Sequence, residues 1–367
     1  MILRVPEYYN EFECIADKCT DSCCRGWEVD VDEDSHFYYE TIKGEFGDKI
    51  RKVTYENPEE EEGFGFTLTK DKRCPFLNDK NLCDMFIEIG EESLCDVCTN
   101  FPRFGMSYQS SNGIINQKFL SLACEEVGRI LFSMKESVKF IDIEQPGGDW
   151  FEEDEEDIRI CDFVEKVQWD AINILRDKSI SIWDRMKKYL LFINDKHFEL
   201  NEAVMADKFT ENVKREIKFD DYLDRLELIK DLETVAYNWD EERNSLLNDV
   251  KEENYESMIN NFLSSEGYVE LDYEQLMIYF TFRYMMNAID DLDLISYGKL
   301  AIVFTLLVRD MDALRYARKG EYTRKDRIEI TRIFSKEVEH AQENIDAARE
   351  AFLFDDVFKT DNLLKQI

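Results

Sequence analysis

Residues 14–27 of this chain read CIADKCTDSCCRGW. Four cysteines fall in this short segment, and most of the others follow before residue 125. The nine cysteines of this first third are Cys14, Cys19, Cys23, Cys24, Cys74, Cys83, Cys95, Cys98 and Cys124. Only Cys161 lies beyond them, and it is predicted to be a buried apolar thiol. The first third of the chain is therefore predicted to be organised by its cysteines.

Three interpretations of these cysteines compete: disulfides, buried free thiols and metal ligands. The chain starts without the charged region and apolar run of a secretory signal, so disulfides would have to persist in a reducing compartment, and nine cysteines cannot all pair. Core thiols are common, but burial alone does not explain Cys23-Cys24 or Cys95-x2-Cys98. Metal coordination explains both the spacing and the crowding. All nine are therefore predicted metal ligands in a cytoplasmic protein.

The ligand chemistry narrows the metal to two alternatives. His36 is the single histidine of this region, so an almost wholly thiolate ligand set suits either tetrahedral zinc or an iron–sulfur cluster. The spacing does not choose between them. Because adjacent side chains point in different directions, Cys23 and Cys24 need not serve the same centre, and nine thiolates permit two centres with one left over. Metal binding is expected to help hold this region together.

Charge and hydropathy limit the partners. The chain has 46 Lys and Arg against 81 Asp and Glu, a formal net charge of −35, and no basic cluster, so nucleic acid is not an expected partner. The longest apolar run, Leu300 to Val308, is far shorter than the roughly 20 residues that a membrane span needs. A folded, soluble protein is expected. Its acidic surface serves solubility alone or attracts a lysine-bearing substrate.

The remaining patterns predict a mainly α protein of two domains. Alternation over Trp27–Asp32 predicts a strand, and Asn112-Gly113 predicts a hairpin turn between two further strands. The Gly- and Pro-containing segment Gln145–Asp149 marks a boundary, followed by an acidic stretch that ends at Asp157. We therefore predict a small irregular α+β cysteine-rich metal-binding domain over 1–148 and an all-α domain over 149–367.

Three patterns place helices in the second domain. Apolar and aromatic residues recur at three- and four-residue steps from Leu276 to Ala288, which predicts a packed helix. Thr323-x-x-Asp326 indicates a helix start, and an apolar stripe from Phe334 to Phe352 is expected to pack on a neighbouring helix. The run from Leu300 to Val308 is predicted to be a buried central helix.

The ordered motifs of the whole chain resemble the flagellin lysine N-methylase family. These motifs are Val5-Pro6-Glu7-Tyr8-Tyr9, Cys14-x4-Cys19-x3-Cys23-Cys24-x-Gly26-Trp27, Cys74-Pro75-Phe76-Leu77, Leu94-Cys95-x2-Cys98 with Phe101-Pro102-Arg103, Leu120-Ser121-Leu122-x-Cys124, Tyr279-Phe280-Thr281-Phe282-Arg283-Tyr284 and Glu337-Val338-Glu339-His340-x2-Glu343-Asn344. The cysteines alone also resemble a broader group of zinc- or iron-chelating domains. One departure is Glu125-Glu126 after Cys124, where the family pattern has Pro-Glu; it is expected to affect the local turn and hardly the function.

This resemblance implies transfer of a methyl group from S-adenosylmethionine to lysine ε-amines of flagellin, beside a cysteine-bound iron–sulfur centre (4Fe–4S) or zinc. No strand is followed by a G-x-G loop, so a Rossmann-like cofactor pocket is not predicted. The catalytic residues and the S-adenosylmethionine site stay unassigned. The alternative is a non-catalytic cysteine-rich zinc or iron–sulfur protein with a structural, storage or redox-sensing role.

Two other constellations have both a functional and a structural interpretation. Glu337-x-x-His340 places a carboxylate and an imidazole at a spacing used in di-iron bundles, but one copy supplies too few ligands. Tyr279, Phe282 and Tyr284 could line an aromatic slot for a cation, whereas core packing explains the same stripe. His36 and His197 have no predicted partner.

Overall fold

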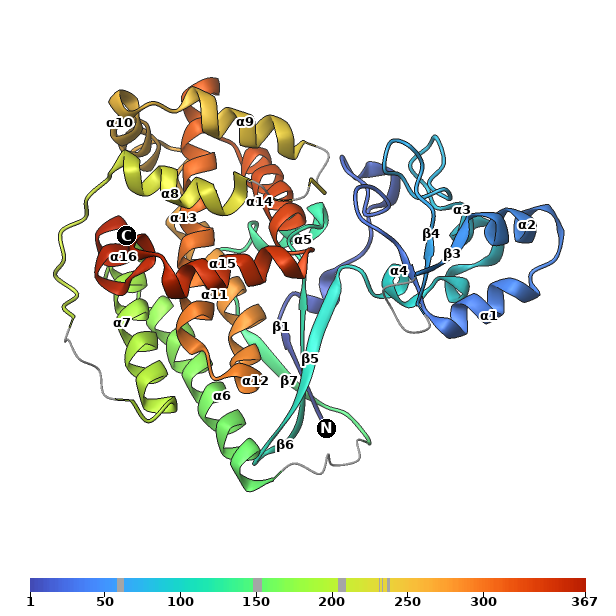
Figure 1. Ribbon diagram of the computed structural model, residues 1–367, viewed down its shortest axis with the longest axis horizontal. Coiled ribbons are helices and arrows are strands. Elements are labelled where there is room, and N and C mark those ends of the chain that lie inside the picture. Colours follow the sequence, from blue (N-terminus) through green and yellow to red (C-terminus); the bar gives the residue numbers. More distant parts are fainter. Residues whose placement is uncertain (58–62, 148–153, 204–208, 231, 233, 236–237) are drawn as a thin grey trace.

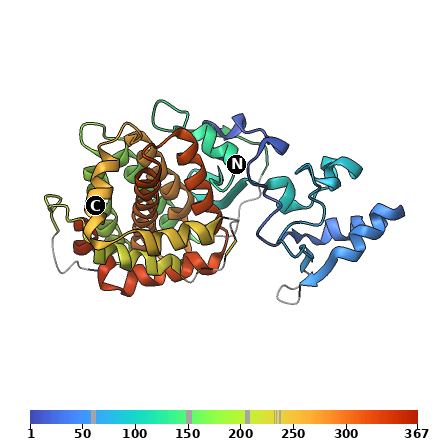
Figure 2. The same ribbon diagram turned by 90° about the horizontal axis from the view of Figure 1, so that it is seen from above.

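The computed structural model describes residues 1–57, 63–147, 154–203, 209–230, 232, 234–235 and 238–367. Figure 1 and Figure 2 both show a small lobe, drawn in blue and cyan, beside a larger helical lobe. Each lobe has its own apolar core. The predicted mainly α class is confirmed, with two small sheets added to the helices.

The small lobe combines an antiparallel sheet with short helices. Its elements are β2 (Asp30–Val31), α1 (Glu33–Thr41), α2 (Gly44–Val53), β3 (Thr54–Asn57), β4 (Gly63–Phe66), α3 (Asp84–Ile89) and α4 (Asp96–Asn100), with strand order β2-β4-β3. The strand predicted over Trp27–Asp32 shrinks to β2. Asp32 ends it, because this carboxylate accepts hydrogen bonds from the backbone N–H of Ser35 and of Asp96, both at 2.8 Å. It thereby caps α1 and fixes the start of α4.

A four-stranded sheet packs on the helical lobe. Its strands are β1 (Ile2–Pro6), β5 (Arg103–Ser110), β6 (Gly113–Leu120) and β7 (Phe140–Glu144), in the order β5-β6-β1-β7. The predicted hairpin is confirmed: Ser110 pairs with Gly113, whose φ of +114° favours glycine. β1 runs parallel to β6 and antiparallel to β7.

The helical lobe surrounds one long buried helix. Its elements are α5 (Glu125–Leu131), α6 (Glu155–Leu175), α7 (Ile182–Leu200), α8 (Phe219–Lys230), α9 (Trp239–Asp249), α10 (Glu252–Leu263), α11 (Glu270–Tyr284), α12 (Ala288–Asp291), α13 (Leu294–Lys319), α14 (Arg324–Val338), α15 (Gln342–Phe354) and α16 (Thr360–Gln366). α13 contacts α7, α10, α11, α14 and α15 and is buried from Leu294 to Arg315. The central helix predicted around Leu300–Val308 is confirmed.

The carboxy-terminal helices depart from the prediction at one point. α14 starts with the expected capping box of Thr323 and Asp326. The apolar stripe from Phe334 to Phe352, however, lies on two helices, because α14 ends at Val338. Glu339 turns inward there and its carboxylate pairs with Arg283 at 3.0 Å.

The residues of the two apolar cores do not separate at residue 148, the predicted division between the domains. The larger core joins Val5, Ile115 and Leu120 of the sheet to the helices, whereas the small-lobe core runs from Val29 to Cys95. Residues 148 and 149 of the predicted boundary segment lie outside the described residues, so the domain division stays a prediction. Within the described ranges, the helices are all too short or too polar to cross a membrane.

A candidate metal centre in a cysteine-lined cavity

A cavity of about 590 Å³ opens in the small lobe, where it meets the rest of the molecule. All nine cysteines of the first third line this cavity: Cys14, Cys19, Cys23, Cys24, Cys74, Cys83, Cys95, Cys98 and Cys124. None of them forms a disulfide in this arrangement. The structure thus brings together side chains that are up to 110 positions apart in the sequence, as the spacing had predicted.

Three of the thiols occupy the first position before a helix. Cys83, Cys95 and Cys124 are the N-caps of α3, α4 and α5. Burial raises the pKa of Cys124 to about 12, and hydrogen bonds from the backbone N–H groups of Val127 and Glu126 act in the opposite direction. Backbone donors at a helix start stabilise a thiolate, which is the form that binds a metal.

Four cysteines form a first group at one end of the cavity: Cys14, Cys19, Cys23 and Cys124. The charges of Cys19 and Cys14 raise the pKa of Cys124. Those of Cys14 and Cys124 raise the pKa of Cys23. Glu125 fixes this group, because its carboxylate accepts a hydrogen bond from the Thr20 N–H at 2.8 Å and lies 3.8 Å from the Cys19 sulfur. Glu125, one of the two residues that depart from the family pattern, therefore contacts the cysteine loop.

Five cysteines form a second group: Cys24, Cys74, Cys83, Cys95 and Cys98. Burial and the thiol of Cys24 raise the pKa of Cys74 to about 12, with smaller effects from Cys83 and Cys95. A hydrogen bond with Cys95, followed by burial, raises the pKa of Cys98, and Cys24 and Cys74 act in the same direction. The Cys74 N–H also donates to the Cys24 carbonyl at 2.8 Å.

Cys23 and Cys24 sit where the two groups meet. Their sulfur atoms are 4.0 Å apart. The hydrogen bond between them raises the pKa of Cys23 and lowers that of Cys24 to about 7, and Lys336 and Arg73 also lower the pKa of Cys24. The two sulfur atoms thus lie side by side, whereas adjacent side chains were predicted to point in different directions.

The structure leaves the metal ligands untested. Across the part of the chain that is described, three or more His, Cys, Asp or Glu side chains nowhere stand close enough together to hold an ion. His36 does not line the cavity; its ring stacks on Phe64 with centroids 3.6 Å apart. The donors that the cavity offers are therefore thiols and carboxylates, without an imidazole.

The cysteine loop is joined to the helical lobe by a buried ionic contact. The Asp21 carboxylate accepts hydrogen bonds from Arg332 at 2.6 Å and from Lys336 at 2.9 Å, both on α14. The Lys336 ammonium also lies 4.6 Å from the centre of the Trp27 ring. Gly26 permits the close approach, because a Cβ atom there would lie 2.1 Å from the Val235 carbonyl oxygen.

The sequence did not identify Asp21, Glu125 or Lys336 as part of this site. Asp21 lies between Cys19 and Cys23, and Glu125 directly follows Cys124, so proximity to a ligand in the sequence was the available signal. Lys336 had no such signal, because it reaches the cysteine loop only through the tertiary fold.

Comparison with known proteins places the chain among methylases. A family model described as the FliB lysine N-methylase C-terminal domain matches residues 171–366, which is more than half of the chain. The chain belongs to the FliB lysine N-methylase family. The match covers the helical lobe from the last residues of α6 to the end of α16.

Curated relatives in this family come from Salmonella. The Flagellar biosynthetic protein FliU of Salmonella muenchen is 30% identical over 136 residues, which are 34% of this chain and 75% of that protein. The Lysine-N-methylase of Salmonella typhimurium is 31% identical over 134 residues, 34% of this chain and 31% of the relative. The chain thus matches about a third of the length of that methylase. No solved structure matches this chain.

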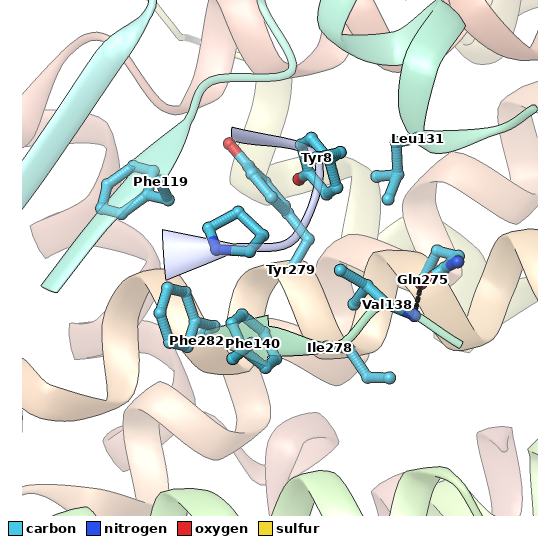
Figure 3. A pocket seen from close by; sticks show the side chains of 10 residues that line it. Tyr8, Phe119, Leu131, Val138, Phe140, Gln275, Ile278, Tyr279 and Phe282 are labelled. Atoms are coloured by element: carbon cyan, nitrogen blue, oxygen red, sulfur yellow. Dashed lines mark hydrogen bonds between the residues drawn. The ribbon is translucent and has the colours of Figure 1, made fainter. Parts of the chain in front are cut away.

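The aromatic residues of α11 pack in the core, which is the structural one of their two interpretations, and do not line a slot for a cation. Tyr279 and Phe282 line a second cavity with Tyr8 and Phe140, shown in Figure 3, but its volume is about 10 Å³. That space holds no more than about one water molecule. Packing against the strands is therefore the role of these rings.

The Glu337 and His340 pair also separates in this FliB-family structure. Glu337 accepts a hydrogen bond from the Val235 N–H at 2.9 Å, whereas His340 bonds to the Ser121 hydroxyl at 3.0 Å. Burial, with the nearby charges of Arg283 and Lys336, lowers the pKa of His340 to about 3. Cys161 is 1% exposed on α6, as predicted.

The Asp21→Asn substitution tests the contact between the lobes. It removes the negative charge that faces Arg332 and Lys336, whose side chains are 6% and 2% exposed. Leaving two buried cations unpaired is expected to lower the free energy of unfolding by about 3 kcal/mol, measured by urea denaturation. Asp17→Asn removes the same charge from an exposed position of the same loop. It is expected to change the free energy of unfolding by less than about 0.5 kcal/mol. Equal stability of both variants would contradict the role of Asp21.

Proposed function

We propose that this chain is a protein-lysine N-methyltransferase that transfers a methyl group from S-adenosylmethionine to lysine ε-amines of flagellin, in the cytoplasm. The observation that carries the proposal is the family match over residues 171–366. The name of one relative, lysine-N-methylase, supports the reaction, and the name of another, flagellar biosynthetic protein, supports a flagellar substrate.

The cysteine cavity is the proposed place of the reaction. Its volume of about 590 Å³ exceeds what a metal ion needs and falls in the range of small-molecule sites, about 300–1,000 Å³. Exposed Glu13 and Glu91 belong to its wall, and Glu125 lies beside the first cysteine group. These carboxylates, in a chain of net charge −35, attract a lysine ammonium.

The chemistry sets a requirement on the lysine. The amine nitrogen must attack the methyl carbon with its lone pair, so that the N–C bond forms as the C–S bond of the sulfonium breaks. Free lysine has a pKa of about 10.4 and arrives protonated, so it must lose a proton before the attack. Removing the lysine ammonium from water in the cavity lowers its pKa, and its proton then passes to solvent or to a base.

We propose further that the nine cysteines hold zinc or an iron–sulfur cluster. Thiolates are the preferred donors of both, and the cavity wall supplies nine thiols. The grouping supports two centres, one at Cys14, Cys19, Cys23 and Cys124 and one drawn from Cys24, Cys74, Cys83, Cys95 and Cys98. A bound metal would supply structural stability and, as a cluster, electron-transfer chemistry. Binding would draw the thiols inward from their present positions.

Cysteine replacements test the metal proposal. Cys95→Ser with Cys98→Ser should remove about half of the zinc or iron per chain, measured by elemental analysis after anaerobic purification, if there are two centres. Cys14→Ser with Cys124→Ser should remove the other half. Cys161→Ser replaces a buried cysteine outside the cavity and should leave the metal content unchanged. Full occupancy without both Cys95 and Cys98 would overturn their assignment as ligands.

A methylation assay tests the reaction. Metal-replete protein, S-adenosylmethionine and unmodified flagellin are incubated, and lysine mass shifts are read. The initial rate should rise with pH, by up to about tenfold per unit below the pKa of the bound lysine, until another group limits it. The absence of both a mass shift and S-adenosylmethionine binding would favour the alternative, a non-catalytic metalloprotein.

The acidic wall of the cavity gives a separate expectation for substrate capture. Glu13→Gln with Glu91→Gln should raise KM for flagellin about threefold or more and change kcat less, because encounter depends on charge. Glu343→Gln with Glu350→Gln removes the same charge from exposed positions of α15 and should not change KM. Higher salt should reduce the difference, because the screening length is about 8 Å at physiological ionic strength. An equal KM in both double variants would contradict this electrostatic role.

A further inference from the structure

A cluster of cations lies inside the helical lobe, far along the chain from the cysteines. Arg225 of α8 and Arg309 of α13 share a single carboxylate, Asp310, which is fully buried. Each arginine approaches a different oxygen of Asp310 at 2.8 Å. Asp310 also accepts a hydrogen bond from the Tyr255 hydroxyl at 3.1 Å, so its carboxylate is already shared by three side chains.

Arg215, in the segment before α8, is a third cation. Its guanidinium lies 5.3 Å from the centre of the Trp183 ring on α7, and that of Arg309 lies 5.8 Å from the same ring. Burial and the charge of Arg309 lower the pKa of Arg215 to about 10, which still leaves it positive at neutral pH. Two like charges thus approach one indole.

The guanidinium nitrogens of this pair are short of acceptors. Nε and Nη2 of Arg215 and Nη1 of Arg309 are buried without a hydrogen-bond partner among the residues that the structure describes. Arg309 is 1% exposed, whereas Arg215 is partly accessible. Buried donors that lack a partner are expensive, and in a native structure they commonly mark a position where water or an ion binds.

The other strongly buried arginines of the lobe each have a carboxylate partner, although Arg185 and Arg327 also keep nitrogens without a hydrogen-bond partner among the described residues. Arg185 pairs with Glu274, Arg283 with Glu339 and Arg327 with Asp312. Arg215, by contrast, makes no ion pair with a carboxylate among the residues that the structure describes, in a chain with 81 acidic residues and 46 basic ones. The two arginines at Trp183 therefore have one carboxylate between them, Asp310, which Arg309 shares with Arg225.

The geometry points to an oxyanion-binding site formed by Arg215 and Arg309 at Trp183, with a carboxylate or phosphate group as its ligand. Two guanidinium forks with three free donors match the planar or tetrahedral oxygens of these groups, which bind arginine in pairs of hydrogen bonds. The anion would neutralise the repulsion between the two arginines. The site itself does not depend on the proposed methyl transfer.

Two sources of such a group are distinguished by experiment: free phosphate, and the carboxylate of S-adenosylmethionine, whose relevance rests on the proposed function. The thermal unfolding midpoint of the full chain is measured with about 10 mM of each probe against sodium chloride at equal ionic strength. We expect a rise of about 2 °C or more with at least one probe. A phosphate-only response assigns a free oxyanion, and a response to S-adenosylmethionine assigns its carboxylate.

Substitutions of Arg215 locate the response. Arg215→Gln removes the unpaired cation, so it should raise the midpoint without added anion and abolish the rise caused by the probe. Arg215→Lys keeps the charge but loses the fork, and it should fold as the wild type does with a smaller rise. Lys214→Gln removes one charge from the exposed neighbouring residue and should respond as the wild type does. No rise with either probe, or an unchanged rise in Arg215→Gln, would overturn the site.

Discussion

The crowding of nine thiols around one cavity is the constraint on which the rest of this structure depends. Each thiol that ionises raises the pKa of its neighbours, and burial has the same effect, so Cys74 and Cys124 reach about 12. A shared positive charge would remove both penalties at once, because coordination stabilises thiolates. Cys83, Cys95 and Cys124 each directly precede a short helix, whose first backbone N–H groups stabilise the thiolate form of these cysteines.

The helical lobe and the cavity depend on each other through α14. Arg332 and Lys336 would be unpaired buried charges without Asp21, and the cysteine loop that carries Asp21 has little regular structure of its own. Lys336 also contributes to the lowered pKa of Cys24. Lys336 therefore connects the cysteine cavity, the proposed metal site, with a helix of the lobe that the family match covers.

Local patterns predicted much of this architecture. Asn112-Gly113 identified the hairpin, the run Leu300–Val308 identified the central helix, and cysteine spacing identified the side chains that gather at the cavity. The sequence could not divide these cysteines into groups, because Cys74 and Cys24 meet through backbone contacts between distant loops. It also missed the end of α14, since apolar periodicity continues past Val338 into α15, while Glu339, the first residue after α14, forms a buried pair with Arg283.

X-ray absorption at the metal edge of anaerobically purified protein tests the central claim most directly. If the cysteine cavity binds the metal, the first coordination shell consists of sulfur, at about 2.3 Å for zinc. This first shell should change in the double variant Cys95→Ser with Cys98→Ser and stay the same in Cys161→Ser. A shell of nitrogen and oxygen at about 2.0–2.1 Å, or protein that folds and methylates lysine without any bound metal, would contradict the account.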